Sequence, residues 1–200
     1  TLHYTLRKYG AVSEQLHLGN RSRDEASLVA YLIMTQSKIP FERVVHLDGA
    51  SETPWLEDGG RTIRGPLAIA DHIAARCPPH ALWPARDQEA RALAEQALTS
   101  FAALRAAYPF NPALASTPNP AAKAELLKLD QLWSQLRKDR PDSSFLFGEF
   151  GVVDAAFAPL VLRVVHCRLE LSASARAYAA NVYALPAIAR WTRAALEDQG

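Results

Sequence analysis

The fold is decided by residues 53–66, which read TPWLEDGGRTIRGP. Within this stretch, Asp58-Gly59-Gly60 favours a tight hairpin turn, because glycine adopts the positive φ angles that such turns need. Residues 55–57 and 61–63 supply the two strands of that hairpin. Gly65 and Pro66 then form a favourable helix start, with glycine at the cap and proline at the first helical position. The stretch therefore predicts a hairpin followed directly by a helix.

The residues around this stretch alternate between strand and helix patterns. Residues 13–18 predict a strand, and residues 26–38 predict a helix that ends before Pro40, because the residue preceding a proline prefers an extended backbone. Residues 41–47 predict a second strand, and residues 66–76 predict a helix with apolar side chains at helical spacing. The order strand, helix, strand, hairpin, helix predicts a small α/β layer.

The chain changes character at Pro78-Pro79, because two prolines forbid a continuing helix. Alanine, the strongest helix former, is sparse before this point and abundant after it. We therefore expect an all-helical second part, with helices at 87–107, 121–139, 152–166, 172–184 and 186–197. The predicted division of the chain is a leading segment at 1–12, an α/β domain at 13–78 and a helical domain at 84–200.

Composition and charge argue against several classes of function. Lys and Arg number 22 against 21 Asp and Glu, so the formal net charge is +1, which argues against a nucleic-acid partner. No apolar run approaches the ~20 residues needed to span a bilayer, and residues 1–10 contain no signal-peptide core. We therefore expect a cytoplasmic protein with no membrane partner.

The cysteines and histidines predict neither redox nor metal chemistry. Cys77 and Cys167 form no disulfide framework and no CxxC motif, and no spacing of His, Asp and Glu predicts a metal site. We interpret Cys77 as a buried or boundary thiol and His17 and His46 as core or edge residues. His166 and Cys167 are adjacent on a predicted helix, where they point about 100° apart, so we interpret them as structural too.

Four stretches, taken in order, resemble the cytosolic glutathione S-transferase superfamily over roughly residues 13–197. They are residues 27–42, residues 53–60, residues 67–73, and Phe145-Leu146-Phe147-Gly148 with Gly151-Val152-Val153-Asp154. The resemblance implies a thioredoxin-like domain at 13–78, then the all-helical domain, in a divergent bacterial member with a degenerate glutathione site. Gly148 and Asp154 are predicted to be structural, because a carboxylate three residues after a helix cap reaches back to the free N–H of the cap.

In that family, glutathione lies along the hairpin edge, and the residue before a cis-proline pairs with the cysteine of glutathione through its backbone. The resemblance gives this role to Thr53 and implies a cis bond to Pro54. An acidic residue and a serine at the start of the next helix hold the γ-glutamyl group, but here Gly65 and Pro66 occupy those positions. Pro66 has neither a hydroxyl nor an N–H, so a plain helix start is the alternative. Arg64 is a further candidate to pair with a carboxylate, or else a solvated charge.

The family also places a Tyr, Ser or Cys near the end of the first strand, where it stabilises the glutathione thiolate. The turn after Asn20 here lacks the serine-rich pattern of the bacterial branch. Asn20, Arg21 and Ser22 are the candidate catalytic donors, with turn, loop and cap roles as their alternatives. Asp24 and Glu25 would repel a thiolate, and their other role is favourable charge at a helix N-terminus.

Two further features concern the walls of the predicted cleft. Only residues 48–52 lie between the second strand and Thr53, too few for the second helix of the family, so we expect that helix and its wall to be missing or replaced. Phe101, Arg105 and Tyr108 lie one helical turn apart where the family holds its second substrate. They are candidate pocket residues, and core aromatics with a surface arginine are the alternative.

Three functions stay open from the sequence. The first is a glutathione-dependent transferase with a remodelled site, which needs glutathione as its cosubstrate. The second is a binding or scaffold protein that kept the fold and lost the chemistry. The third is an enzyme that uses the cleft for another small substrate without glutathione. The resemblance also implies a homodimer, because the superfamily commonly pairs its subunits.

Overall fold

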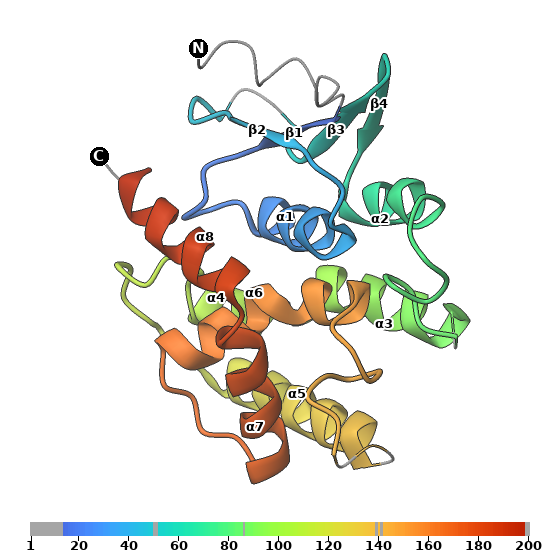
Figure 1. The fold of residues 1–200 in the computed structure, drawn as a ribbon. Coiled ribbons are helices and arrows are strands. Elements are labelled where there is room, and N and C mark those ends of the chain that lie inside the picture. Colours follow the sequence, from blue (N-terminus) through green and yellow to red (C-terminus); the bar gives the residue numbers. More distant parts are fainter. Residues whose placement is uncertain (1–13, 50–51, 86, 139, 141, 199–200) are drawn as a thin grey trace.

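A computed structural model describes residues 14–49, 52–85, 87–138, 140 and 142–198. The predicted leading segment at 1–12 lies outside the described residues. Figure 1 shows a small sheet with two helices beneath it, and further helices packed below those two. No helix in the described part of the chain is long and apolar enough to cross a membrane.

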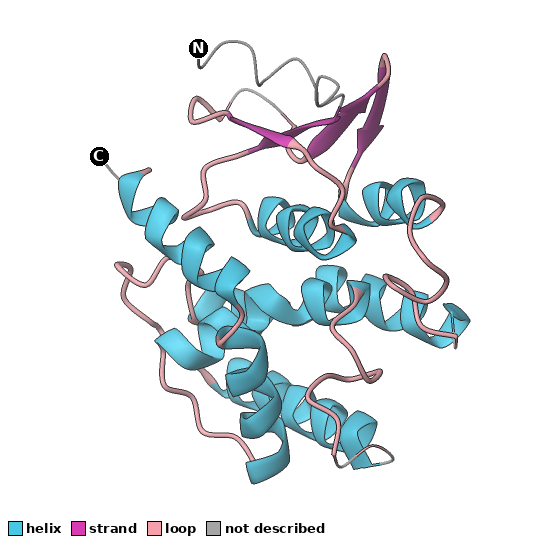
Figure 2. Cartoon of the chain, viewed as in Figure 1, coloured by secondary structure: helices cyan, strands magenta, loops and turns pink. Residues whose placement is uncertain are grey.

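The N-terminal part is a thioredoxin-like layer, as predicted. Its strands are β1 (Glu14–Leu18), β2 (Glu42–Val45), β3 (Trp55–Asp58) and β4 (Arg61–Arg64), in the spatial order β2-β1-β3-β4. The pair β1–β2 is parallel, and the pairs β1–β3 and β3–β4 are antiparallel. Helices α1 (Glu25–Ser37) and α2 (Pro66–Ala74) cover one face of this sheet (Figure 2). The described residues between β2 and β3 contain no helix, in line with the short 48–52 connection.

The remaining chain is helical, also as predicted. Its helices are α3 (Asp87–Thr99), α4 (Ala102–Ala107), α5 (Pro120–Lys138), α6 (Val152–His166), α7 (Ala173–Tyr183) and α8 (Pro186–Glu197). The single helix predicted for 87–107 is wrong, because the chain breaks at Phe101, which has a φ of 64°. Polar contacts stabilise the break. The Arg105 guanidinium donates to the carbonyls of Ala97 and Ser100 at the end of α3, and the Leu104 N–H donates to Glu125.

Helix α6 is the buried centre of the molecule and packs against α1, α3 and α7. The Asp154 carboxylate holds its start, accepting the Gly151 N–H at 3.1 Å and the Leu146 N–H at 3.1 Å. Complete burial raises the pKa of Asp154 to about 6. Gly148, in the preceding turn, has a φ of 109°, which glycine adopts without strain. The sequence assigned structural roles to Asp154 and Gly148, and their surroundings here are those of a buried helix start.

Substitution of Asp154→Ala should destabilise the protein by about 3 kcal/mol, because it leaves one buried and one partly buried N–H group unpaired, at roughly 1–3 kcal/mol each. Urea unfolding measures the loss. Glu149→Ala is the matched control, since Glu149 is exposed and close by, and it should change stability by less than about 0.5 kcal/mol. An equal, small effect of both substitutions would contradict the role given to Asp154.

The face of the sheet opposite α1 and α2 carries an imidazole–indole stack. The His17 ring lies parallel to the Trp55 ring, with centroids 4.4 Å apart, and its Nδ1 lies 3.0 Å from His46 Nε2. Burial lowers the pKa of His17, more strongly than the neighbouring Glu57 raises it. The folded state therefore favours the neutral ring.

Titration of His17 should lower stability as the pH falls from 7.5 to 5.5, against an opposite contribution from Asp154, whose pKa is raised in the folded state. The His17 pKa in the folded protein lies below its ordinary value of 6.5, so the unfolded chain takes up the proton first and acid favours unfolding. His17→Phe keeps an aromatic ring against Trp55 but cannot titrate. Urea unfolding at both pH values should show a smaller loss for this variant than for the wild type. An identical loss in both proteins would rule out His17 as a source of the pH dependence.

Candidate functional site

Thr53 and Pro54 lie at the junction of the sheet and α1, and the bond between them is cis. The Pro54 carbonyl accepts the Gly65 N–H at 2.9 Å, which ties this turn to the start of α2. The Thr53 hydroxyl donates to Asp24 Oδ2. Gly19 faces both groups so closely that a Cβ there would overlap the carboxylate and the hydroxyl. The side chain of Thr53 is therefore engaged with the start of α1.

The N-terminus of α1 is occupied by acidic groups of the protein itself. Asp24 is its cap, and the carboxylate accepts the Ser27 N–H at 3.0 Å and the Ser27 hydroxyl at 2.6 Å. Glu25, in the first turn, forms ion pairs with Arg105 of α4 and Arg163 of α6. A helix N-terminus attracts negative charge through its dipole and its free N–H groups. At α1 the chain supplies that charge.

The three candidate catalytic donors are held by internal contacts. Asn20 Oδ1 accepts the N–H of Ser22 at 3.0 Å and its hydroxyl at 2.7 Å. Arg21 binds Asp198, just beyond α8, through its backbone N–H at 2.9 Å and its guanidinium at 2.7 Å. The Trp191 indole also donates to the Arg21 carbonyl at 3.2 Å. The loop between β1 and α1 is thus fastened to α8.

The start of α2 offers no acidic or hydroxyl side chain to a ligand. Gly65 is the cap, with a φ of 84°, and Pro66 is the first helical residue. The Gly65 N–H already donates to Pro54, and Pro66 has none to donate. Arg64 is exposed and lies over the Trp55 ring, 5.6 Å from its centroid. This cation–π contact is formed on the outer face of the sheet.

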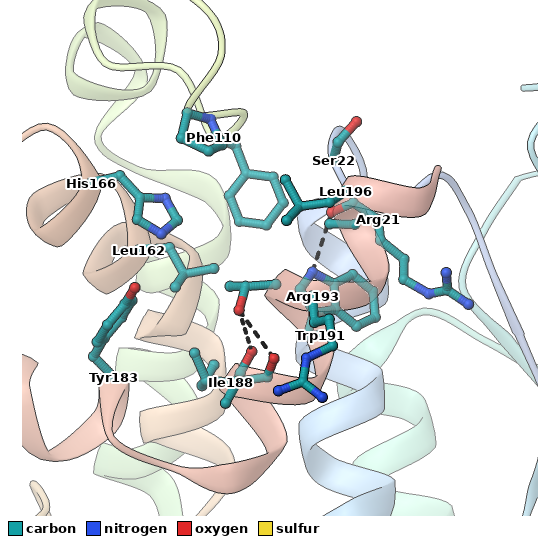
Figure 3. A pocket seen from close by; sticks show the side chains of 14 residues that line it. Arg21, Ser22, Phe110, Leu162, His166, Tyr183, Ile188, Trp191, Arg193 and Leu196 are labelled. Carbon is teal, nitrogen blue, oxygen red and sulfur yellow. Dashed lines mark hydrogen bonds between the residues drawn. The ribbon is translucent and has the colours of Figure 1, made fainter. Parts of the chain in front are cut away.

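A cavity of about 400 Å³ lies between the β1–α1 loop and the helical part (Figure 3). Its wall is mainly apolar, and the loop contributes Arg21 and Ser22. The remaining lining residues are Phe110 and Pro112 after α4, Leu162 and His166 of α6, Tyr183 of α7, and Ile188, Ala189, Trp191, Thr192, Arg193, Ala195 and Leu196 of α8. Cavities of this size commonly bind small molecules.

Phe101, Arg105 and Tyr108 are not on the wall of this cavity. Phe101 and Tyr108 are buried, the Tyr108 carbonyl accepts from Arg163 at 2.8 Å, and Arg105 pairs with Glu25. Desolvation by burial lowers the pKa of Arg105, more strongly than Glu25 raises it. The break at Phe101 ends the regular helical spacing that connected the three residues in the sequence. Arg105 thus joins the helical part to α1, while Phe101 and Tyr108 belong to the buried core.

The sequence did not identify most of the cavity residues. In hindsight, Ile188, Thr192 and Ala195 recur at helical spacing on α8 and signal one face of that helix. Periodicity alone does not say whether such a face packs against a core or borders a cavity. In the described part of the chain, no group of three or more His, Cys, Asp or Glu side chains is placed to hold a metal ion.

Comparison with solved structures identifies the fold. A glutathione transferase homolog from Burkholderia, crystallised with bound glutathione, superposes with a TM-score of 0.72 at 20% identity, covering 92% of this chain and 98% of that one. The tau class enzyme from mango has a TM-score of 0.69 at 17% identity, covering 92% and 96%. Human glutathione S-transferase T1-1 has a TM-score of 0.60 at 20% identity, covering 92% and 88%. No protein-family model and no curated protein matches the sequence.

We expect the contact between Arg21 and Asp198 to stabilise the protein and to hold the end of α8 in place. Asp198→Ala should lower the free energy of unfolding by about 2 kcal/mol, since it removes hydrogen bonds between charged, largely buried groups. Backbone amides in the last turns of α8 should also exchange faster with deuterium. Glu197→Ala, next to it and exposed, is the control and should leave both quantities nearly unchanged. Unchanged exchange in Asp198→Ala would show that the contact does not hold α8.

Proposed function

We propose that this chain, which has the glutathione S-transferase fold, binds an apolar small molecule in the cavity beside α8 and does not activate glutathione. The observation that carries the proposal is the position of the Asp24 carboxylate. It caps α1 and accepts a hydrogen bond from Thr53, the residue to which the family resemblance assigns the backbone contact with the glutathione cysteine.

Electrostatics supports this proposal. A thiolate placed about 4 Å from the Asp24 carboxylate would be repelled by about 1 kcal/mol in water and about 4 kcal/mol at an effective dielectric constant of 20. Asn20 and Arg21 do little to offset that cost, because the Asn20 amide N–H and the Arg21 guanidinium both donate to Asp198. The local charge therefore disfavours the ionised form of the thiol, which is the reactive form.

A second argument against glutathione concerns its γ-glutamyl end. Its γ-glutamyl group carries a carboxylate, which the fold family binds at the start of α2. Here that position offers no acid or hydroxyl side chain, and the Gly65 N–H is used by the Pro54 carbonyl. Two of the contacts that hold the tripeptide are thus replaced by contacts within the chain.

The cavity fits the binding of apolar molecules better. Its wall combines aliphatic side chains such as Leu162 and Ile188 with the aromatic rings of Phe110 and Trp191. Removal of apolar ligand surface from water is favourable at roughly 25 cal/mol per Å². A ligand with two fused rings is of a suitable size for a cavity of about 400 Å³.

A glutathione transferase with a remodelled site is the second candidate, and the Thr53-Pro54 pair before β3, which resembles the proline turn of the family, favours it. The backbone of Thr53 is the part of the family site that the chain keeps. Pairing with the cysteine of glutathione through that backbone is the contact this candidate requires. An enzyme that acts in the cavity without glutathione is the third. Homodimer formation and a cytoplasmic location remain predictions.

Thermal unfolding with two ligands tests the proposal. Saturation with 2-methylnaphthalene at ten times its Kd should raise the melting temperature by about 3 °C, because a ligand bound only to the folded state stabilises it. Glutathione at millimolar concentration should leave the melting temperature unchanged. A clear rise with glutathione alone would favour the second candidate and contradict ours.

A pair of alanine-to-phenylalanine variants tests whether the ligand binds in this cavity. Ala195→Phe places a ring at the cavity wall and should abolish the shift produced by 2-methylnaphthalene. Ala177→Phe introduces the same ring on an exposed part of α7 away from the wall, and should keep the shift. Equal shifts in both variants would place the bound ligand elsewhere on the protein.

A further inference from the structure

The polar groups on one side of the cavity are already used by the protein. The Ser22 hydroxyl donates to Asn20 at 2.7 Å, and the Trp191 indole donates to the Arg21 carbonyl at 3.2 Å. On α8, the Thr192 hydroxyl lies within hydrogen-bond distance of two carbonyls of its own helix, at 3.1 and 3.2 Å. These groups gain little from a ligand, because their hydrogen bonds are already made.

His166 and Tyr183 differ from them. Both line the cavity, and Figure 3 shows them on the side opposite Arg21 and Ser22. Their rings meet edge to face, with centroids 5.8 Å apart and planes at 87°. Among the described residues, neither side chain has a hydrogen-bond partner: Nδ1 of His166 is buried without one, and Tyr183 is 37% exposed. This side of the cavity thus carries two adjacent polar side chains that no other described residue engages.

The protonation state of His166 determines which ligand groups can form hydrogen bonds with this pair of side chains. Burial lowers its pKa, so near neutral pH the ring is uncharged, with one nitrogen that donates and one that accepts. The Tyr183 hydroxyl also donates and accepts. A ligand hydroxyl matches both groups whichever ring nitrogen carries the proton, because it too donates and accepts. Arg193 also lines the wall, but a guanidinium only donates hydrogen bonds, whereas His166 and Tyr183 can each donate and accept.

Building on the proposed function, we propose that the cavity selects aromatic molecules bearing a hydroxyl group, which hydrogen-bonds to His166 and Tyr183. The ring system occupies the apolar wall around Leu162 and Ile188, and the hydroxyl points to the end of the cavity formed by α6 and α7. A site that hydrogen-bonds a ligand hydroxyl discriminates against the analogue that lacks it, because the polar groups of the protein are then left unpaired.

The test compares 2-naphthol with 2-methylnaphthalene, which has a methyl group in place of the hydroxyl. Equilibrium dialysis gives a Kd for each compound with the wild type and with the double variant His166→Phe, Tyr183→Phe. The preference, defined as the ratio of the two Kd values, should fall about tenfold in the double variant, because the hydroxyl then loses both of its hydrogen-bond partners. Circular dichroism confirms that each protein is folded.

Thr192→Val is the matched control, because it removes a hydroxyl from the same wall whose hydrogen bonds lie within α8. It should keep the wild-type preference. An unchanged preference in the double variant, or an equal fall in Thr192→Val, would overturn the inference while leaving the proposed function intact. If the folded wild type binds neither compound, the proposed function fails as well.

Discussion

The arrangement of the site depends on one carboxylate, that of Asp24 at the start of α1. It caps the helix through Ser27 and accepts the Thr53 hydroxyl, so it joins the first helix to the turn before β3. Gly19 is the neighbour that makes room for both groups. The carboxylate also lies at the N-terminus of α1, where the helix dipole attracts negative charge. A single side chain thus starts α1 and ties it to the turn before β3.

A second set of contacts fixes the sheet part against the helices. Glu25 pairs with Arg105 and Arg163, and Arg21 pairs with Asp198. Arg21 comes from the loop before α1, and Glu25 from the first turn of that helix. The cavity bordered by α8 lies beside the same loop, and its wall is mainly apolar. Under the function proposed above, a ligand would bind there by burying apolar surface.

The fold could be predicted from the sequence because its signals are local. The hairpin turn, the Gly65–Pro66 helix start and the spacing of Gly151 and Asp154 each act within a few residues. The break at Phe101 could not, because it relies on Glu125, which is distant in the sequence.

The candidate site was predictable only in part, for the same reason. Sequence reasoning selected Asn20, Arg21 and Ser22 as donors, but their partners include Asp198 at the far end of the chain. The cavity wall combines residues from several helices, and no local pattern brings them together.

The most direct test of the central claim is a two-dimensional ¹⁵N–¹H NMR titration of the labelled protein. On addition of millimolar glutathione, we expect the amide resonances of Thr53 and Gly65 to stay unchanged. We also expect 2-methylnaphthalene to shift the indole N–H resonance of Trp191, which borders the cavity. Saturable shifts of Thr53 and Gly65 with glutathione would show that the tripeptide still binds along the hairpin, and would contradict the account.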